Sequence, residues 1–426
     1  MKQLTLSIDT SCDETAAAVI RGVAVVSNVV ASQVELHKPF GGVFPTVAKQ
    51  AHKEHIWQVI AVALRRAKVS PRQITNIAVT VGPGLAPALE VGISAAVNLA
   101  VAWNIPLRPV NHLEGHLLSV LAKPVEKPKG YRSAANRAVA PAHLFPALGI
   151  LVSGGHSQFF LIDRPTTTPK LTTLSPTLNT SVACLELTSF LNLRLEKELQ
   201  IDPMELDFST LQVISVATNQ ELIDRYPNLS LTPTGSKPWL NSGMLELTLL
   251  GSTLDDAAGE ALDKIGRMVN LGYPAGPVIE EFAKKGNESA VVFPLPLTHV
   301  KDYNLSFSGL KTFARNHLTK IGGADKLHKQ EIYDFAASTQ YAIFKHICYK
   351  LNSILTDAHT KKITQKIGSI WVCGGVGANA QFRRMIRTTI KKSSTLSGTT
   401  SPLLLQPYAK KLYGDNAAMI GISPNS

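Results

Sequence analysis

The sequence predicts an α/β fold built from two similar lobes, and two recurring patterns carry this prediction. Paired β-prone runs around a polar turn, at residues 4–20 and again at 148–162, each predict a hairpin. A β-prone run, a glycine-rich turn and a helical stretch follow one another at 74–103 and at 368–386. Strand, turn and helix in this order predict a sheet layer covered by helices. Because each half contains both patterns, we expect an internal duplication of structure, without a residue-level repeat.

Within the first lobe, a helix is expected at 48–66, after GGVFP, and a strand at 74–81 that leads through GPGL into a helix at 86–103. In the second lobe, LDDAAGEALDK at 254–264 predicts an acidic helix that continues toward YPAGP. FFLI, beginning at Phe159, and LELTLL, beginning at Leu245, are expected to be two arms of one hairpin.

These elements divide the chain into expected domains. Residues 1–121 form an N-terminal α/β lobe, and residues 122–146, rich in Pro, Ala and Lys, form a basic, exposed connection. Residues 147–409 form the C-terminal α/β lobe, and 410–426 form a C-terminal helix that returns to the cleft and the first lobe. Residues 165–244 are turn-rich at both ends, with an acidic, leucine-rich middle, and we interpret them as a partly structured insertion.

The composition excludes several classes of protein. A chain of 426 residues with 45% hydrophobic and 17% charged residues is typical of a globular protein of two or three domains. The cysteines are far apart and form no C-x-x-C, which favours reduced thiols in a cytosol: Cys12, Cys184, Cys348 and Cys373. Asp9 interrupts any signal-peptide core, and no uninterrupted apolar run is long enough for a membrane span. We therefore expect a cytoplasmic protein without a membrane association.

The charge is segregated along the chain. The formal net charge is +12, and the stretch from Lys361 to Lys411 contains ten Lys and Arg residues but no Asp or Glu. A second basic stretch lies at 123–143, whereas the balance at 165–250 is acidic. Segregated positive charge attracts polyanions. The pattern therefore favours a nucleic-acid partner over the alternative that the positive charge has no role in binding.

The stretch NHLEGH places His112 and His116 four residues apart, on one face of a helix, where both could bind one metal ion. The intervening carboxylate, Glu114, does not directly follow the first histidine as in the H-E-x-x-H of metalloproteases, and it points to the opposite face. The spacing therefore allows two ligands but provides no neighbouring base. By itself, an isolated pair of this kind is more often two surface histidines.

Three glycine turns that follow strands could bring backbone N–H groups close to a phosphate: GPG at Gly82, SGGHS at Ser153 and GGVG at Gly374. None has the P-loop or Rossmann pattern. Together, in a two-lobed α/β protein, they favour a nucleotide in the cleft.

Carboxylates in two further stretches are candidates for binding. Asp256, Glu260 and Asp263 fall on one face of the expected acidic helix, which is a solvated face unless one of them binds a ribose hydroxyl or an amine. Asp415, in YGDNAAM, stands where a helix would begin, either as its N-cap or as an oxygen ligand of a metal. Considered alone, the N-cap is the more common role.

Ten stretches in order resemble the tRNA N6-adenosine threonylcarbamoyltransferase family, the TsaD-type proteins of the actin-like ATPase (ASKHA) superfold. The stretches are IDTSCDET, GGVFP, GPGL, NHLEGH, LVSGGH, DDAAGEALDK, YPAGP, SFSGLKT, CGGVGAN and GDNAAM. The resemblance spans nearly the whole chain outside the expected insertion. It implies transfer of the threonylcarbamoyl group from threonylcarbamoyl-AMP to N6 of adenosine 37 in tRNAs that read codons beginning with A, with release of AMP.

The resemblance also implies a metal site. His112, His116 and Asp415 would hold one divalent metal ion, with iron(II) favoured over zinc(II), in the cleft between the lobes. Two imidazoles, one carboxylate and open positions suit a Lewis acid that touches substrate. The pair of histidines would thus gain its third ligand from the far end of the chain.

The remaining site residues are carried over by the motifs. Those that would bind the substrate and its nucleotide portion are Leu151, Val152, Ser153, Gly154, Gly155, Asp263, Gly276 and Asn379. Asp13 and Glu14, at the first hairpin, are candidates for handling protons or orienting the attacking amine. The partners implied are tRNA, a TsaB-like paralogue and a TsaE-like ATPase.

Two positions depart from the family's usual pattern. Ala275 stands where a glycine is usual and is expected to narrow the ribose pocket, and Gly414 replaces a threonine before Asp415. Two other activities are weighed against the transferase. One is an ATP-hydrolysing or phosphotransferring enzyme of the same superfold, which would not need the metal triad. The other is a metalloendopeptidase, which the position of Glu114 argues against.

Overall fold

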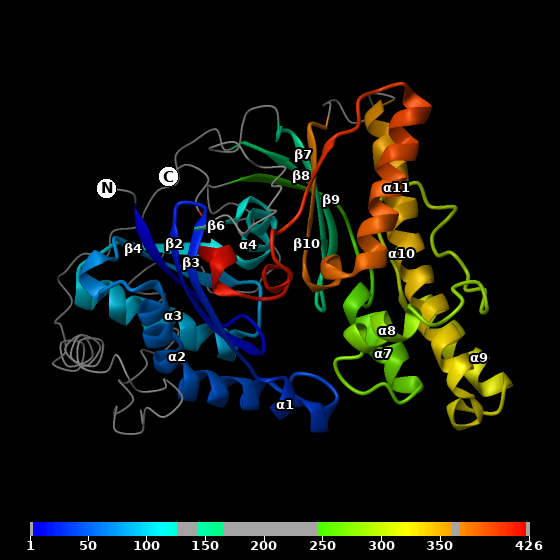
Figure 1. Cartoon of the computed structure of the whole chain (residues 1–426), viewed down its shortest axis with the longest axis horizontal. Helices are drawn as coiled ribbons and strands as arrows, with labels where there is room; N and C mark the ends of the chain where they lie inside the picture. The colour runs from blue at the N-terminus through cyan, green and yellow to red at the C-terminus, as the bar shows by residue number, and fades with distance from the viewer. Residues whose placement is uncertain (1–2, 126–143, 165–244, 360–366, 423–426) are drawn as a thin grey trace. The chain divides into compact units, whose positions relative to one another are not determined.

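The computed structural model describes residues 3–125, 144–164, 245–359 and 367–422, which fall into two compact units. The first unit contains residues 3–125 together with 245–246 and 415–422, and the second contains the other described residues (Figure 1). The expected insertion at 165–244 lies outside the described residues, as does most of the connection expected at 122–146.

The first unit is built on a six-stranded sheet with the strand order β5-β4-β1-β2-β3-β6. Its strands are β1 (Leu4–Asp9), β2 (Glu14–Arg21), β3 (Ala24–Ser32), β4 (Asn76–Gly82), β5 (Leu107–Asn111) and β6 (Lys123–Pro124). β1 and β2 pair in antiparallel fashion, which confirms the first predicted hairpin, and β1, β4 and β5 run parallel. The carboxyl ends of these parallel strands therefore lie at one edge of the sheet.

Alternation along β1 assigns the helices of this unit to two faces of the sheet. Leu6 and Ile8 share a core cluster with residues of α2 (Pro45–Ala67) and α3 (Ala86–Trp103). Ser7 points to the opposite face, where it contacts the C-terminal helix α12 (Ala417–Gly421). Shorter elements complete the unit: α1 (Val34–His37), η1 (Lys38–Phe40), η2 (Pro71–Gln73), α4 (His112–Leu118) and η3 (Ser119–Leu121).

The helix α3 confirms the prediction at 86–103 to the residue. It is also the one described helix that is long and apolar enough to cross a membrane by length and composition, and 61% of it is buried within the protein. Its residues Ile93, Ala96 and Leu99 belong to the core cluster behind the sheet. These features are those of a core helix.

The second unit repeats the strand arrangement of the first. Its five-stranded sheet has the order β11-β10-β7-β8-β9, with β7 (Ala147–Val152), β8 (Ser157–Asp163), β9 (Glu246–Ser252), β10 (Ser369–Cys373) and β11 (Leu403–Leu405). In the first sheet, β1 lies between β2 and β4, and β5 lies at the edge beyond β4. In the second sheet, β7 likewise lies between β8 and β10, and β11 lies at the edge beyond β10. This shared order is the duplicated actin-like fold. β8 and β9 are neighbours in this sheet, so FFLI and LELTLL lie side by side, as the expected hairpin requires.

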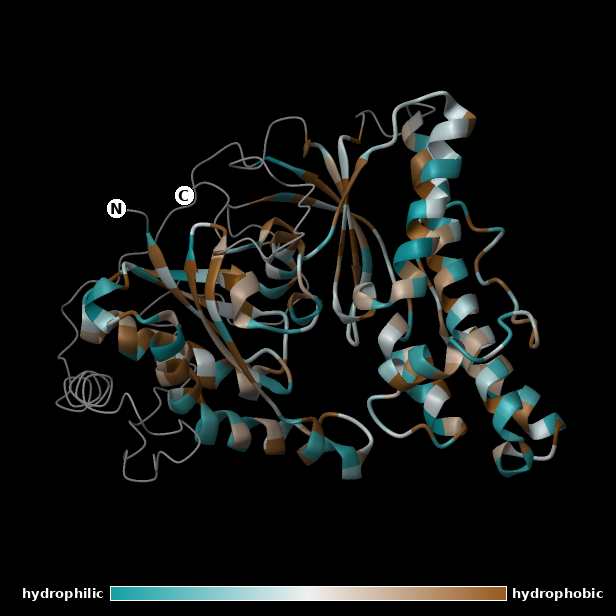
Figure 2. Ribbon diagram, viewed as in Figure 1, coloured by the Kyte–Doolittle hydropathy of each residue, from teal (hydrophilic) through white to brown (hydrophobic). Residues whose placement is uncertain are grey.

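Helices on this second sheet bury a large apolar core. They are α7 (Ala258–Met268), α8 (Gly276–Ala283), α9 (Ser308–Lys320), α10 (Lys329–His359) and α11 (Ala380–Ser397), with short turns η7 (Ala324–Lys326), η8 (Gly375–Ala378) and η9 (Lys410–Leu412). Ile150 of β7, Ile347 of α10 and Ile386 of α11 are completely buried in the same cluster. Figure 2 shows hydrophobic residues concentrated along the strands and on the sides of helices that face them.

The acidic helix α7 begins at Ala258 and not at residue 254 as predicted. Asp255 accepts hydrogen bonds from the backbone of Phe307 and the hydroxyl groups of Ser306 and Ser308, at 2.6 to 2.7 Å. Asp256, which also precedes the first residue of α7, forms ion pairs with two lysines. These long-range bonds outweigh the local helix propensity of the segment.

Candidate metal centre and glycine-turn site

The two histidines of NHLEGH lie in the first unit, on the short helix α4 that starts immediately after β5. Asn111 caps this helix, because its side chain accepts hydrogen bonds from the backbone N–H groups of Leu113 and Glu114 at 2.9 and 3.3 Å. The cap fixes where the helix begins, so His112 and His116 lie one turn apart on the same face. Both are buried, with exposed fractions of 4% and 0%, which rejects the interpretation as surface histidines.

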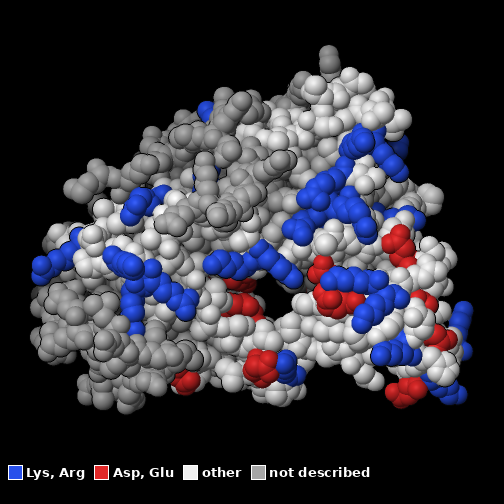
Figure 3. All heavy atoms as spheres, in the orientation of Figure 1, with Lys and Arg blue, Asp and Glu red and all other residues white. Residues whose placement is uncertain are grey.

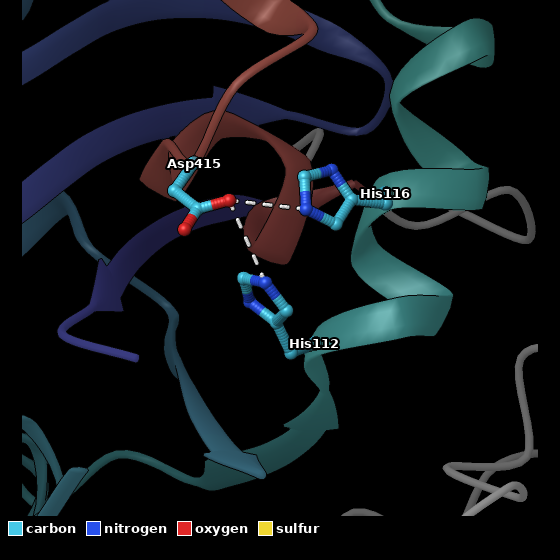
Figure 4. A group of neighbouring side chains, drawn as sticks. All are labelled: His112, His116 and Asp415. Atoms are coloured by element: carbon cyan, nitrogen blue, oxygen red, sulfur yellow. Dashed lines mark ion pairs between the residues drawn. The ribbon is translucent and has the colours of Figure 1, made fainter. Parts of the chain in front are cut away.

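Asp415 reaches the same point from the other end of the described chain. Its Oδ1 lies 3.1 Å from Nε2 of His116 and 3.6 Å from Nε2 of His112 (Figure 4). The N-cap of α12 is Asn416, whose side chain accepts the N–H of Met419 at 3.2 Å. The role of N-cap considered for Asp415 was therefore wrong, and its carboxylate is directed at the two imidazoles.

The three side chains fit a divalent metal ion. One ligand atom from each lies within 4.8 Å of the other two. Both ring nitrogens of His116 are buried and, among the described residues, have no hydrogen-bond partner, which is costly unless another group binds there. Two imidazole nitrogens and one carboxylate oxygen are the donor set of catalytic zinc and non-haem iron sites.

Close packing of α12 against α4 and the sheet holds Asp415 in place. A Cβ on Gly115 would come within 2.7 Å of Cδ1 of Ile420, and a Cβ on Gly421 would overlap Ile20 of β2. Glycine at both positions lets the backbone of α12 approach more closely than any other residue would. The geometry of the triad therefore depends on these two contacts.

Glu114 lies on the opposite face of α4 from the histidines, as its spacing predicted. It is completely buried, and its Oε1 accepts the N–H of Leu245 at 2.8 Å. Its charge also acts on the buried guanidinium of Arg108, which donates to the carbonyl oxygen of Ile420 at 3.0 Å. Glu114 thus stabilises the packing around α12, and it is not the base of a metalloprotease.

Asp9 is a site residue that the sequence analysis did not select. It ends β1, its exposed fraction is 1%, and its Oδ2 lies 3.8 Å from Nδ1 of His112. Burial raises the pKa of Asp9, while the neighbouring His112 acts to lower it. A carboxylate behind a ligating imidazole is a common arrangement that orients the ring and selects its tautomer. Its position at the carboxyl end of a buried strand was the only signal in the sequence.

Asp13 and Glu14 lie at the turn between β1 and β2, within electrostatic reach of Asp415. The pKa of Glu14 is raised well above its ordinary value, first by burial and then by the like charges of Asp13 and Asp415. A carboxyl group with a raised pKa is a stronger base when ionised, which suits general acid or base chemistry.

A chain of buried hydrogen bonds holds the backbone beside this turn. The N–H of Phe44, in GGVFP, donates to Nδ1 of His37, whose Nε2 bonds to the side chain of Gln33 at 3.2 Å. Gln33 donates in turn to Nδ1 of His52 at 3.2 Å, and Nε2 of His52 donates to the carbonyl oxygen of Cys12 at 3.0 Å. These bonds link GGVFP to the residue that precedes Asp13.

The turn GPGL has a structural role in the first unit. The N–H of Leu85 donates to the carbonyl oxygen of Ser11 at 2.8 Å. A Cβ on Gly84 would lie 2.5 Å from the same oxygen. The absence of a side chain at Gly84 therefore allows contact with the first hairpin. This contact explains why a glycine stands at this position, and phosphate binding is not needed to explain it.

In the second unit, glycine-rich segments meet at the carboxyl end of β7. The N–H of Gly259, in the first turn of α7, donates to the carbonyl oxygen of Ser153 at 3.1 Å. Gly374, with φ of 85°, packs against the backbone of Val152. Gly154 and Gly155 are exposed, and a Cβ on either would meet nothing within 4 Å. This turn is the part of the predicted nucleotide site that is open to a ligand.

Leu151 and Val152 differ from the other candidates for nucleotide binding. Their side chains are buried, with exposed fractions of 0% and 1%, and Val152 belongs to the core cluster of the second unit. Any contact with a ligand would have to use their backbone.

Asp263 and Gly276, which the resemblance to the family assigned to one nucleotide site, lie close together. Oδ1 of Asp263 accepts the N–H groups of Ala275 and Gly276 at 2.7 and 3.1 Å. Ala275 is completely buried, and a Cβ on Gly266 of α7 would overlap its methyl group. The methyl group thus packs between α7 and α8, and the narrowing of a ribose pocket stays a prediction. Burial is the main cause that raises the pKa of Asp263.

The other two acids of the DDAAGEALDK stretch form ion pairs. Asp256 pairs with Lys264 at 2.6 Å and with Lys311 at 2.7 Å, and Glu260 pairs with Lys264 at 2.8 Å. Of the three acids considered, Asp263 therefore remains the candidate for a ribose contact.

The side chain of Asn379 is occupied by bonds within the protein. Its Oδ1 accepts the N–H groups of Gln381 and Phe382, which caps α11, and its Nδ2 donates to Gln340 at 2.6 Å. Asn379 fixes the start of α11 next to the glycine turn η8. Because the side chain of Asn379 is occupied, a contact with the adenylate would be made by the turn η8, which Asn379 holds in place.

With this geometry established, comparisons with known proteins decide the family. The family model described as TsaD, tRNA N6-adenosine threonylcarbamoyltransferase, matches residues 24–219 and 209–422. The chain belongs to the TsaD family. The motif NHLEGH, with its two histidines, and Asp415 both lie within the matched segments.

Curated relatives of the TsaD family align along almost the whole chain. The tRNA N6-adenosine threonylcarbamoyltransferase of Magnetococcus marinus is 35% identical over 97% of this chain and 89% of its own length. Those of Geotalea daltonii and Clostridioides difficile are 32% and 33% identical over 98% of this chain, and 90% and 91% of their own lengths are covered. The family membership thus rests on both the sequence model and full-length relatives.

Among solved structures, HypF from T. kodakarensis matches 99% of this chain and 46% of its own length, with 14% identity and a TM-score of 0.46. This likeness is too distant to bear on the function of the TsaD-family chain.

Proposed function

We propose that this chain transfers the threonylcarbamoyl group from threonylcarbamoyl-AMP to N6 of adenosine 37 in tRNAs that read codons beginning with A. Membership of the TsaD family supports the class of reaction. The observation that carries the proposal is the convergence of His112, His116 and Asp415 on one point, from segments far apart in the sequence.

His112 and His116 would hold the divalent ion through Nε2, and Asp415 through Oδ1, since these atoms face one another. We propose iron(II), with zinc(II) as the alternative. Bound there, the ion supplies Lewis-acid polarisation of the carbamoyl carbonyl group. Asp9, behind Nδ1 of His112, would keep that ring in the orientation needed for ligation.

Asp13 and Glu14 would serve the attacking amine. N6 of the adenosine forms a bond to the carbamoyl carbon, the bond from that carbon to the AMP phosphate oxygen breaks, and N6 loses one proton. A carboxylate at this turn is suited to accept that proton, and the raised pKa of Glu14 makes its carboxylate a stronger base. Much of the remaining rate would come from positioning, because AMP is a good leaving group.

The turn formed by buried Ser153 and exposed Gly154 and Gly155 would receive the phosphate and threonyl portion of the substrate through its backbone. Asp263, which already orders the N–H groups of Ala275 and Gly276, would bind the ribose. Leu151, Val152 and Asn379 would shape this site through backbone position and through the start of α11.

In the cell we propose a cytoplasmic enzyme that works with a TsaB-like paralogue and a TsaE-like ATPase. The segregated positive charge of the chain supports tRNA as its macromolecular substrate.

The experiment that tests this function uses the purified chain, an unmodified tRNA that reads codons beginning with A, and threonylcarbamoyl-AMP. Nucleosides are analysed by mass spectrometry, with the metal and the two candidate partners added or left out. We expect N6-threonylcarbamoyladenosine and an equal amount of AMP. If no combination yields the modified nucleoside, and the chain given ATP without the ATPase partner hydrolyses it steadily, the ATP-hydrolysing alternative replaces the transferase.

A further inference from the structure

One face of α11 is lined with exposed cations. Arg384, Arg387, Lys391 and Lys392 are all exposed, at spacings of three, seven and eight residues from the first, which place them on a single face. The other face of the helix carries Phe382, Ile386 and Ile390, which are buried in the core of the second unit. The helix is thus fixed by its apolar side, and it presents its charged side to the solvent.

This positive charge has no acidic counterpart on the helix or nearby in the sequence. No Asp or Glu occurs from Lys361 to Lys411. Within the described part of the chain, the four cations form no ion pair, and Arg387 donates a hydrogen bond to the neutral side-chain amide of Gln406 at 3.3 Å. Figure 3 shows Lys and Arg side chains gathered over α11 without Asp or Glu among them.

Two exposed lysines on other segments of the described chain have acidic partners three residues away. Lys284 pairs with Glu281 three residues before it, and Lys38 pairs with Glu35 in the same way. Such i,i+3 pairs cancel the local field, so they attract no polyanion. The face of α11 keeps its field, and a concentrated positive field recruits anionic chains.

We propose that the exposed face of α11 binds the phosphate backbone of the tRNA substrate. The inference rests on the proposed function and adds to it the surface that holds the RNA. From Arg384 to Lys392 the helix rises about 12 Å, at about 1.5 Å per residue, so the cations can contact several successive phosphates. Two arginines at the start of the row offer paired donors to phosphate oxygens.

Anionic lipid is a poorer occupant of this surface. A helix that lies on a membrane inserts its apolar face among the lipid chains, whereas the apolar face of α11 is buried against α10 and the sheet. On α11, Leu396 is the one large apolar side chain that is exposed, at 87%, so the helix offers little apolar surface to lipid chains.

The test measures direct binding of the full-length chain to unmodified tRNA at several salt concentrations. We expect the double variant Arg384→Gln/Lys391→Gln to bind about tenfold more weakly near 0.1 M salt, and its plot of log K against log salt to be flatter by about two. The matched control, Arg315→Gln/Lys320→Gln, removes the same charge from exposed positions on α9 and is expected to bind like the parent chain.

Binding and modification are read separately, so a failure of the inference is distinct from a failure of the proposed function. If the parent chain modifies no tRNA but the α11 variant alone loses tRNA binding, the inference stands and the transferase does not. If both double variants bind tRNA equally well, or if the parent chain binds none, α11 is not the RNA surface. Binding to phosphatidylserine vesicles that is lost in the α11 variant, with unchanged tRNA binding, would overturn the inference in favour of lipid.

Discussion

Nε2 of His116 lies 3.1 Å from Oδ1 of Asp415, although the two residues come from distant segments of the chain. His116 is held by the capped helix α4, and Asp415 is held by the turn that leads into α12. This contact brings a third candidate ligand to a common H-x-x-x-H pattern. The predictions below test that site and the packing that creates it.

Removal of either partner should abolish metal binding. We expect His116→Ala and Asp415→Asn to weaken the affinity for zinc(II) or cobalt(II) about 100-fold or more, as measured by calorimetry and, for cobalt, by its absorption spectrum. His299→Ala is the matched control because that histidine is exposed and lies outside the triad. Unchanged metal affinity in Asp415→Asn would show that the aspartate is no ligand.

Glu114 should contribute to stability and not to the binding of the metal. Glu114→Ala leaves the N–H of Leu245 without its acceptor and Arg108 without its buried counter-charge, so we expect a loss of about 3 kcal/mol in the free energy of unfolding. Glu114→Gln keeps an acceptor and should lose less. Denaturant unfolding gives these values, and a metal titration of the Gln variant should match the parent chain. A protease base would instead give unchanged stability and lost activity.

The contact between Gly115 and Ile420 should couple helix packing to the metal. In Gly115→Ala the new methyl group meets Cδ1 of Ile420 at 2.7 Å, which pushes α12 and Asp415 away from the histidines. We expect weaker metal binding, measured by the same titration. The double variant Gly115→Ala/Ile420→Val lacks the clashing Cδ1 atom and should regain most of the affinity. If the double variant is no better than the single one, the contact does not position Asp415.

Gly266 and Ala275 should compensate for each other. Gly266→Ala places two methyl groups in the space of one between α7 and α8, so we expect a loss of about 1 to 3 kcal/mol in the free energy of unfolding. Ala275→Gly in the same chain should restore part of this loss, because it removes the other methyl group. Thermal unfolding of the single and double variants measures the coupling, and purely additive effects would contradict the packing seen here.

The buried His346 should make the protein less stable in mild acid. Its Nε2 accepts the N–H of Ser306 at 3.1 Å, and burial, with a smaller effect of Lys350, lowers its pKa from 6.5 to about 4. Between these two values the unfolded chain binds a proton that the folded chain does not, so stability is present above pH 6.5 and falls as the pH drops toward 4. The loss from this residue is at most about 3 kcal/mol. Denaturant unfolding at several pH values measures it, and His346→Gln should show a flatter dependence.

The sequence by itself determined the elements whose pattern is local. Paired β-prone runs around a polar turn within 4–20 and 148–162 predicted both hairpins, and the apolar run of Ala86–Trp103 predicted α3, because both signals depend only on residues close together in the chain. The spacing of His112 and His116 placed both on one face of α4 for the same reason, and it placed Glu114 on the other.

Only the tertiary structure decided which of two adjacent residues would meet the histidines. Asp415 and Asn416 are equally suited to cap a helix, and packing of α12 on α4 gives the cap to Asn416 and directs Asp415 to the triad. The same holds for Asp9, whose contact with His112 joins β1 to α4, and for Ala275, whose methyl group meets Gly266. These relations depend on the close approach of segments far apart in the chain, and hydrophobicity along one segment carries no information about which partner it will meet.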